Sequence, residues 1–283
     1  MRGRTLLAAL VLAVLLSGCG TASVPRESVP PPSPSAAPRQ QSPPAPVPTP
    51  PAAPSEGRDS ELRYHTTSSY DLETGIRRTT LDAQGRCLSV YFEVPVFEEA
   101  TAGYRKINAF FEELTERFFS PDNQQLTAAW GYASGAGSLA VPEAPFFYQR
   151  PAAVGAHTAG LVSVTIGYQW MMGGVLDYGS DSYTFRTDTG ELLGLADLVD
   201  AGEYALRELI FTALKERVSQ DEREHGSSPI DLEHLKGYDL DDYEFAVDEN
   251  GTILLLFDKY EAADGAYGGF DLTLPVPLKP DFI

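Results

Sequence analysis

Residues 162–170 read VSVTIGYQW and decide how the second half of the chain folds. Apolar or aromatic side chains occupy every second position from Val162 to Trp170, with small or polar residues between them. A period of two residues is typical of a β-strand, because successive side chains point to opposite faces of a sheet. Gly173-Gly174 follows, and this pair is expected to end the strand in a turn.

Further strands are expected on both sides of this segment. The clearest runs from Leu88 to Val94, where apolar and polar residues alternate as in a half-buried strand. Asn250-Gly251 predicts a tight hairpin turn between strands at 243–247 and 252–257. Shorter strands are expected at 64–70, 76–81 and 270–277, and at 182–188 with a hairpin turn at Thr189-Gly190.

Two amphipathic helices are expected, at about residues 100–119 and 202–220, because apolar side chains recur there at steps of three and four. Residues 131–151 are rich in Gly, Ala and Pro and are expected to be irregular. The whole pattern predicts an α+β fold of two blocks, 58–150 and 151–283. Each block is expected to hold a mainly antiparallel sheet and one amphipathic helix.

The first 19 residues have the features of a bacterial lipoprotein signal peptide. Arg2 and Arg4 precede an uncharged apolar run, Leu6–Leu16, of about eleven residues, short of the ~20 that span a bilayer. Leu16-Ser17-Gly18-Cys19 matches the lipobox, in which the cysteine thiol takes up the lipid. An ordinary signal peptide with a stray cysteine is the alternative. We expect acylation at Cys19 and an extracytoplasmic chain anchored to the bacterial membrane.

Residues 20–57 are expected to form a disordered tether, since Val24–Pro54 holds 13 of the 22 prolines. Proline lacks a backbone donor and favours polyproline II, so a spacer is the expected role. Without the four arginines and two glutamates of residues 1–57, 17 basic and 38 acidic residues remain, a formal charge of −21. That charge disfavours nucleic acid and favours a cationic partner, although many secreted domains are acidic for solubility alone.

No arrangement of residues in the chain identifies a catalytic or metal site. His65, His157, His225 and His234 have no metal-ligand spacing, and no nucleophile elbow, phosphate loop or dinucleotide fingerprint is present. The acidic segment 231–248 lacks the ligand spacing of a calcium loop. Cys87 is expected to be a small buried residue. No cofactor and no catalytic residue are therefore predicted.

Aromatic residues near glycine-rich turns are the candidate ligand-binding residues, because aromatic side chains presented from loops often anchor interfaces. Core packing is the alternative for each of them. The candidate set is Tyr168, Trp170, Gly173, Gly174, Tyr178, Tyr260 and Tyr267.

Two stretches, YQWMMGG at 168–174 and YTFRTDTGELLGLADLV at 183–199, carry a family resemblance. The two stretches contain four features in order: an aromatic strand, a Gly-Gly turn, a strand that ends in Thr-Gly, and a Leu-x-Asp-Leu sequence at the start of a helix. This order resembles the extracytoplasmic domain family of the lysozyme-sensing anti-sigma factor RsiV. The tail agrees in 251–257, in KYEAA at 259–263 and in Leu274-Pro275, and the first block, with Ile107-Asn108, resembles the smaller domain that precedes it.

The resemblance implies an outer domain that binds lysozyme, and related domains accompany peptidoglycan deacetylases. The chain shows no sigma-binding segment and no membrane-spanning helix, so we do not expect an anti-sigma role. Val175-Leu176 stand where the family has Ala-His.

Three functions follow as hypotheses. The first is a surface lipoprotein that binds a cationic protein, lysozyme above all, or a component of the wall such as peptidoglycan. The second is a peptidoglycan-active enzyme or an accessory domain to one, which turnover of wall polymer would reveal. The third is a structural role in envelope assembly, which co-purification from solubilised membranes would reveal.

Overall fold

A computed structural model describes residues 64–98, 100–135, 146–172, 174–263 and 265–283, all within one compact unit, Arg58–Ile283. The expected signal peptide and tether, residues 1–57, and the candidate acylation site Cys19 lie outside the described residues. Among the described helices, none is long and apolar enough to cross a membrane.

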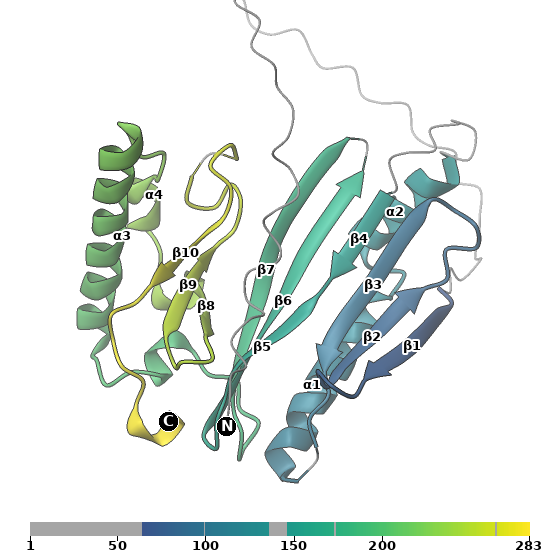
Figure 1. The fold of residues 1–283 in the computed structure, drawn as a ribbon, viewed down its shortest axis with the longest axis horizontal. Helices are drawn as coiled ribbons and strands as arrows, with labels where there is room; N and C mark the ends of the chain where they lie inside the picture. The colour runs from purple at the N-terminus through teal and green to yellow at the C-terminus, as the bar shows by residue number, and fades with distance from the viewer. Residues whose placement is uncertain (1–63, 99, 136–145, 173, 264) are drawn as a thin grey trace, which may run out of the picture. The chain divides into compact units, whose positions relative to one another are not determined.

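Seven strands form the larger of two sheets (Figure 1). In chain order they are β1 (Thr66–Asp71), β2 (Ile76–Leu81), β3 (Leu88–Pro95), β4 (Phe146–Arg150), β5 (Ala152–His157), β6 (Leu161–Met172) and β7 (Val175–Arg186). Their order in space is β1-β2-β3-β4-β6-β5, and β7 pairs with β6. All pairings are antiparallel except that of β3 with β4. The sheet therefore continues across residue 150, where the sequence analysis places a boundary between blocks.

The smaller sheet has three antiparallel strands in the order β10-β9-β8. These are β8 (Glu244–Val247), β9 (Ile253–Phe257) and β10 (Phe270–Thr273). The helices are α1 (Ala102–Phe118), α2 (Gln124–Gly135), α3 (Glu203–His225) and α4 (Leu232–Leu235), with 3-10 turns η2 (Leu195–Asp197), η3 (Leu240–Asp242) and η4 (Pro280–Phe282). The predicted α+β class with mainly antiparallel sheets is confirmed.

Two hydrophobic cores lie on opposite faces of the large sheet. Neighbouring residues of β6 show the division, since Leu161 belongs to the core that holds α3 and the small sheet, and Val162 belongs to the core that holds α1 and α2. Both residues are fully buried. Figure 1 shows the small sheet between α3 and the large sheet. The first half of β6 is buried on both faces. The alternation within VSVTIGYQW places its apolar side chains on one of these faces.

Local capping explains where several elements begin and end. The Thr101 hydroxyl accepts a hydrogen bond from the Tyr104 amide at 3.2 Å and caps the start of α1. Gly226, with φ of +83°, ends α3 in the left-handed region. In the β8–β9 hairpin, the Asp248 carboxylate accepts from the amides of Asn250 and Thr252, both at 2.8 Å. The hairpin predicted at Asn250-Gly251 is confirmed.

The turn expected at Thr189-Gly190 is present, but the hairpin that it closes is short. The Arg186 amide donates to the Glu191 carbonyl at 2.9 Å, and the Leu193 amide donates to the Thr184 carbonyl at 2.7 Å. β7 begins at Val175, immediately after the turn at Gly174, and pairs with β6 along its whole length. Beyond Gly190 a single bridge joins Phe185 to Leu192. The strand expected at 182–188 is thus the end of the longer strand β7, whose main partner is β6.

The irregular segment expected at 131–151 is also corrected. Residues 131–135 complete α2, and residues 146–150 form β4, while residues 136–145 lie outside the described part of the chain. β4 lies between β3 and β6, and its Tyr148 is buried, with its hydroxyl donating to Gln125 of α2 at 2.6 Å. Burial between distant strands overrides the local Gly and Pro content. Cys87, expected to be buried, is exposed just before β3.

Candidate functional site

The loop that follows β9 is attached to the free edge of β7 by carboxylates. The Asp258 carboxylate accepts from the Ser180 amide at 2.9 Å and from the Tyr168 hydroxyl at 3.2 Å. Two residues further along β7, the Ser182 amide donates to Glu244 of β8. These bonds satisfy N–H groups that an edge strand would otherwise expose. They also hold the loop after β9 against the end of the β6–β7 hairpin.

Gly179 makes this attachment sterically feasible. A Cβ atom at that position would lie 2.2 Å from Asp258 Oδ2, so any side chain there would displace the carboxylate. Residue 179 must therefore be glycine if Asp258 is to reach the Ser180 amide.

Lys259 joins the same loop to the hairpin tip. Its ammonium donates to the Leu176 carbonyl at 3.2 Å, and it lies 4.9 Å from the ring centroid of Tyr260 and 5.9 Å from that of Tyr178. Cation–π contacts at these distances are stabilising, so one ammonium group interacts with both rings. Tyr260 adopts a φ of +72°, which is uncommon for a residue with a Cβ atom.

The resulting surface, here called the tyrosine patch, consists of Leu176, Tyr178 and Tyr260. Their exposed fractions are 45%, 43% and 67%, in that order. Large apolar side chains that gather on a surface from separate elements are typical of interaction sites. The patch is thus formed by β7 and the loop after β9, two segments that lie about 80 residues apart in the sequence.

Half-buried carboxylates surround the base of the patch. This acidic rim consists of Asp177, Asp181, Glu244, Asp258 and Glu261. Burial raises the pKa of Glu244, Asp258 and Glu261 above the ordinary carboxyl range, and neighbouring members of the rim raise it further. Burial and the charge of Asp258 also raise the pKa of Tyr168. The rim presents negative charge beside the exposed rings.

Arg150 reduces this charge at one end of the rim. Its guanidinium pairs with Asp181 and lies 5.7 Å from the ring centroid of Tyr168. The side chain of Arg150 is 14% exposed. Tyr168 therefore contacts both a cation and the Asp258 carboxylate.

The candidate residues of the sequence analysis divide into four groups, of which the last, Tyr267, is described in the next paragraph. Tyr168, Tyr178 and Tyr260 meet around Asp258 and Lys259, and Gly174 forms the hairpin turn beside them. Trp170 instead packs against the core beneath α1 and α2. Gly173 and Cys19 lie outside the described residues.

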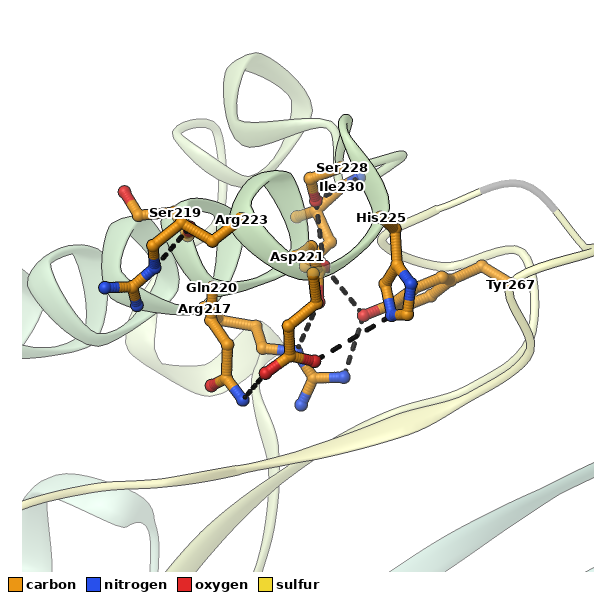
Figure 2. A network of polar contacts seen from close by, with 10 residues as sticks. Arg217, Ser219, Gln220, Asp221, Arg223, His225, Ser228, Ile230 and Tyr267 are labelled. Atoms are coloured by element: carbon orange, nitrogen blue, oxygen red, sulfur yellow. Dashed lines mark hydrogen bonds and ion pairs between the residues drawn. The ribbon is translucent and has the colours of Figure 1, made fainter.

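Tyr267 belongs to a separate polar network on α3 (Figure 2). Its hydroxyl donates to Asp221 at 2.8 Å and accepts from Arg217 at 2.8 Å. Arg217 also pairs with Asp221 at 3.1 Å, and Ser228 donates to the same carboxylate at 2.9 Å. The network joins α3, the turn after it and the β9–β10 loop, so its evident role is structural.

The sequence analysis did not identify Asp258, Lys259 or Glu244 as members of a site. Lys259 lies in the KYEAA segment that carries the family resemblance, but nothing in the sequence indicates that it reaches Leu176. Val175-Leu176 were noted only as a departure from the family.

The acidic segment 231–248 uses its carboxylates to cap the backbone. Asp231 accepts from the amides of Glu233 and His234 at the start of α4, at 3.1 and 3.0 Å. Asp242 accepts from the Asp239 amide at 2.7 Å. Within the described residues, no group of three or more His, Cys, Asp or Glu side chains is placed to hold a metal ion.

Comparison with known proteins gives few matches. No protein-family model matches the chain, and no curated protein matches it. A solved DUF3298 family protein from Pseudomonas aeruginosa PAO1 is similar, with a TM-score of 0.49, 15% identity, and coverage of 78% of this chain and 95% of that one. A DUF3298 family member from Bacteroides fragilis NCTC 9343 has a TM-score of 0.44, 13% identity, and coverage of 77% and 92%. These structural neighbours are DUF3298 family proteins, and likeness at this level supports no inference about function.

Proposed function

We propose that this chain is a surface-anchored bacterial lipoprotein of the RsiV-like type, whose acidic extracytoplasmic domain binds a cationic protein or a cell-wall component. Lysozyme is the leading candidate. The tyrosine patch with its acidic rim is the observation that carries the proposal. The lipobox at Cys19, the proline-rich tether and the family resemblance agree with it.

The two parts of the surface contribute differently to such binding. Exposed tyrosines act as anchors, because each ring loses a large apolar area to the partner at little cost in conformational entropy. The carboxylates of the rim attract a cationic partner and speed its association, but salt screens this contribution. Binding should therefore weaken with salt without disappearing.

Calorimetric titration of soluble residues 20–283 with lysozyme, at low and at physiological salt, tests the proposal. We expect a saturable one-site isotherm that persists at physiological salt. Replacing Tyr178 or Tyr260 by alanine should weaken binding about tenfold each, because each substitution removes one anchor.

Tyr204→Ala is the matched control. Tyr204 is 78% exposed on α3 and does not belong to the patch, so its loss should leave the affinity unchanged. Absence of heat would contradict the proposal that lysozyme binds. Binding that vanishes with modest salt would show that net charge alone causes the attraction. Equal affinities for all three variants would place the contact elsewhere on the surface.

A further inference from the structure

A groove of about 790 Å³ runs between α3 and β10, away from the tyrosine patch. Residues from Thr212 to Arg223 line its helical wall, and Asp271, Thr273 and Pro275 line its strand wall. Figure 1 shows α3 beside the small sheet that ends in β10. The volume falls in the range of ~300–1,000 Å³ that is usual for ligand sites.

The strand wall of this groove is the edge of the small sheet, and no further strand among the described residues pairs with it. The Leu274 amide donates to the Ile253 carbonyl at 2.9 Å, and Leu272 lies opposite Leu255 in the same register. Because hydrogen bonding alternates along an antiparallel strand, the main-chain groups of Asp271 and Thr273 point away from β9. They can pair with a further strand, and Pro275 ends the run of available N–H groups.

Side-chain alternation along β10 determines which face of an added strand would meet α3. Leu272 is buried in the core that α3 covers, so Asp271 and Thr273 direct their side chains to the opposite face. An added strand would present every second side chain to α3 and the others away from it. The side chains of α3 therefore determine which residues of an added strand are accepted on that face.

The helical wall carries three cations, Lys215, Arg217 and Arg223. Arg217 is held by Asp221 and Tyr267, whereas Lys215 and Arg223 have no ion-pair partner among the described residues. Two carboxylates, Glu216 and Asp271, also line the groove. The lining thus holds three cations and two carboxylates, and Asp221 already neutralises Arg217. Lys215 and Arg223 are the cations of the helical wall that carboxylate groups of a ligand could meet.

We propose that an extended, carboxylate-bearing segment of a partner protein binds in this groove as a fourth strand of the small sheet. Its main chain pairs with Asp271 and Thr273, and its alternate carboxylates face Lys215 and Arg223. Main-chain pairing supplies affinity, and the helix supplies specificity for acidic side chains. This site is independent of the tyrosine patch.

Fluorescence anisotropy with soluble residues 20–283 tests the site at physiological salt. The probe is the fluorescein-labelled peptide acetyl-VEVEVE-amide, and acetyl-VKVKVK-amide is its counterpart of opposite charge. We expect saturable binding of the acidic peptide, together with slower hydrogen exchange at the Asp271 and Thr273 amides. If net charge alone governed binding, only the basic peptide would bind.

Two kinds of variant separate the contributions. Thr273→Pro removes the outward N–H and should lower affinity for the acidic peptide at least tenfold, whereas Thr273→Val keeps that N–H and should bind as the parent does. Lys215→Glu combined with Arg223→Glu should also lower the affinity for the acidic peptide at least tenfold. Because both residues lie on α3, this result does not depend on whether β10 tolerates a proline. Failure of the acidic peptide to bind, or unchanged affinity in the helix double variant, would overturn the proposal.

Discussion

Asp221 is the clearest case of one side chain that organises its surroundings. It is 3% exposed, yet its carboxylate receives hydrogen bonds from Tyr267, Ser228 and Arg217 (Figure 2). Burial by itself would raise the pKa of Asp221, but these three partners outweigh it and hold the pKa below its ordinary value. The charged carboxylate is therefore the form that stabilises the fold.

Replacing Asp221 with alanine should lower the free energy of unfolding by about 2–4 kcal/mol, because it leaves Tyr267 and Arg217 without their shared acceptor. Urea denaturation measures this change. Glu224→Ala is the matched control, since that side chain is 54% exposed and bonds only Gln220 and His225 among the described residues. A loss no larger than the control's would show that the network contributes little.

At the scale of elements, close backbone contact joins the two sheets. A Cβ atom at Gly155 of β5 would lie 2.2 Å from the Val247 carbonyl of β8. Ser182 of β7 bonds to Glu244 and to the Phe245 carbonyl, and the buried Ser163 hydroxyl accepts from the Val247 amide at 2.9 Å. The small sheet is thus attached to the large one where the backbone of β8 meets Gly155 and the hydroxyls of Ser163 and Ser182.

Gly155→Ala should therefore destabilise the protein by at least about 2 kcal/mol, because the new methyl group must displace backbone rather than a flexible side chain. Gly131→Ala is its counterpart within α2, where nothing lies within 4 Å of the added Cβ. That change should stabilise by about 0.5–1 kcal/mol. Thermal melts of both variants against the parent measure the difference, and equal shifts would contradict the close contact at Gly155.

Across the whole molecule, the excess of carboxylates shapes how stability depends on pH. Burial raises the pKa of Glu244, Asp258 and Glu261, so the folded state binds protons on these groups more readily than the unfolded chain does. Asp221 and Asp248 have lowered pKa values, so the folded state releases protons from them more readily. As pH falls, protonation of the first set stabilises the folded state, and protonation of the second set destabilises it.

The melting temperature should rise as pH falls from neutrality towards the ordinary carboxyl values of about 4, because the raised groups take up protons in the folded state first. Below the ordinary carboxyl values of about 4, it should fall again as Asp221 and Asp248 are protonated. Calorimetric scans across this range measure the profile. Glu244→Gln should make the rise smaller, and a melting temperature that falls steadily from neutral pH would contradict the assignment.

The candidate site was only partly predictable from the sequence. Tyr178 and Tyr260 were identified because aromatic residues stand near glycine-rich turns, and both lie on the exposed patch. Trp170 and Tyr267 meet the same criterion but contact the core and the α3 network instead. A local pattern cannot separate these cases, because exposure depends on segments that are distant in the chain.

Features that depend on neighbouring residues were determined by the sequence alone. They include the strand at 162–170, the hairpin at Asn250-Gly251 and the acidic charge of the folded region, since alternation, turn chemistry and composition are local properties. Only the tertiary structure decided that β4 lies between β3 and β6, that β7 pairs along all of β6, and that Lys259 joins Tyr178 to Tyr260. The contacts of β4 and Lys259 span long stretches of chain, and their free energy comes from burial and pairing that no local pattern records. The β6–β7 hairpin is local, but its turn residues do not set how far the pairing extends.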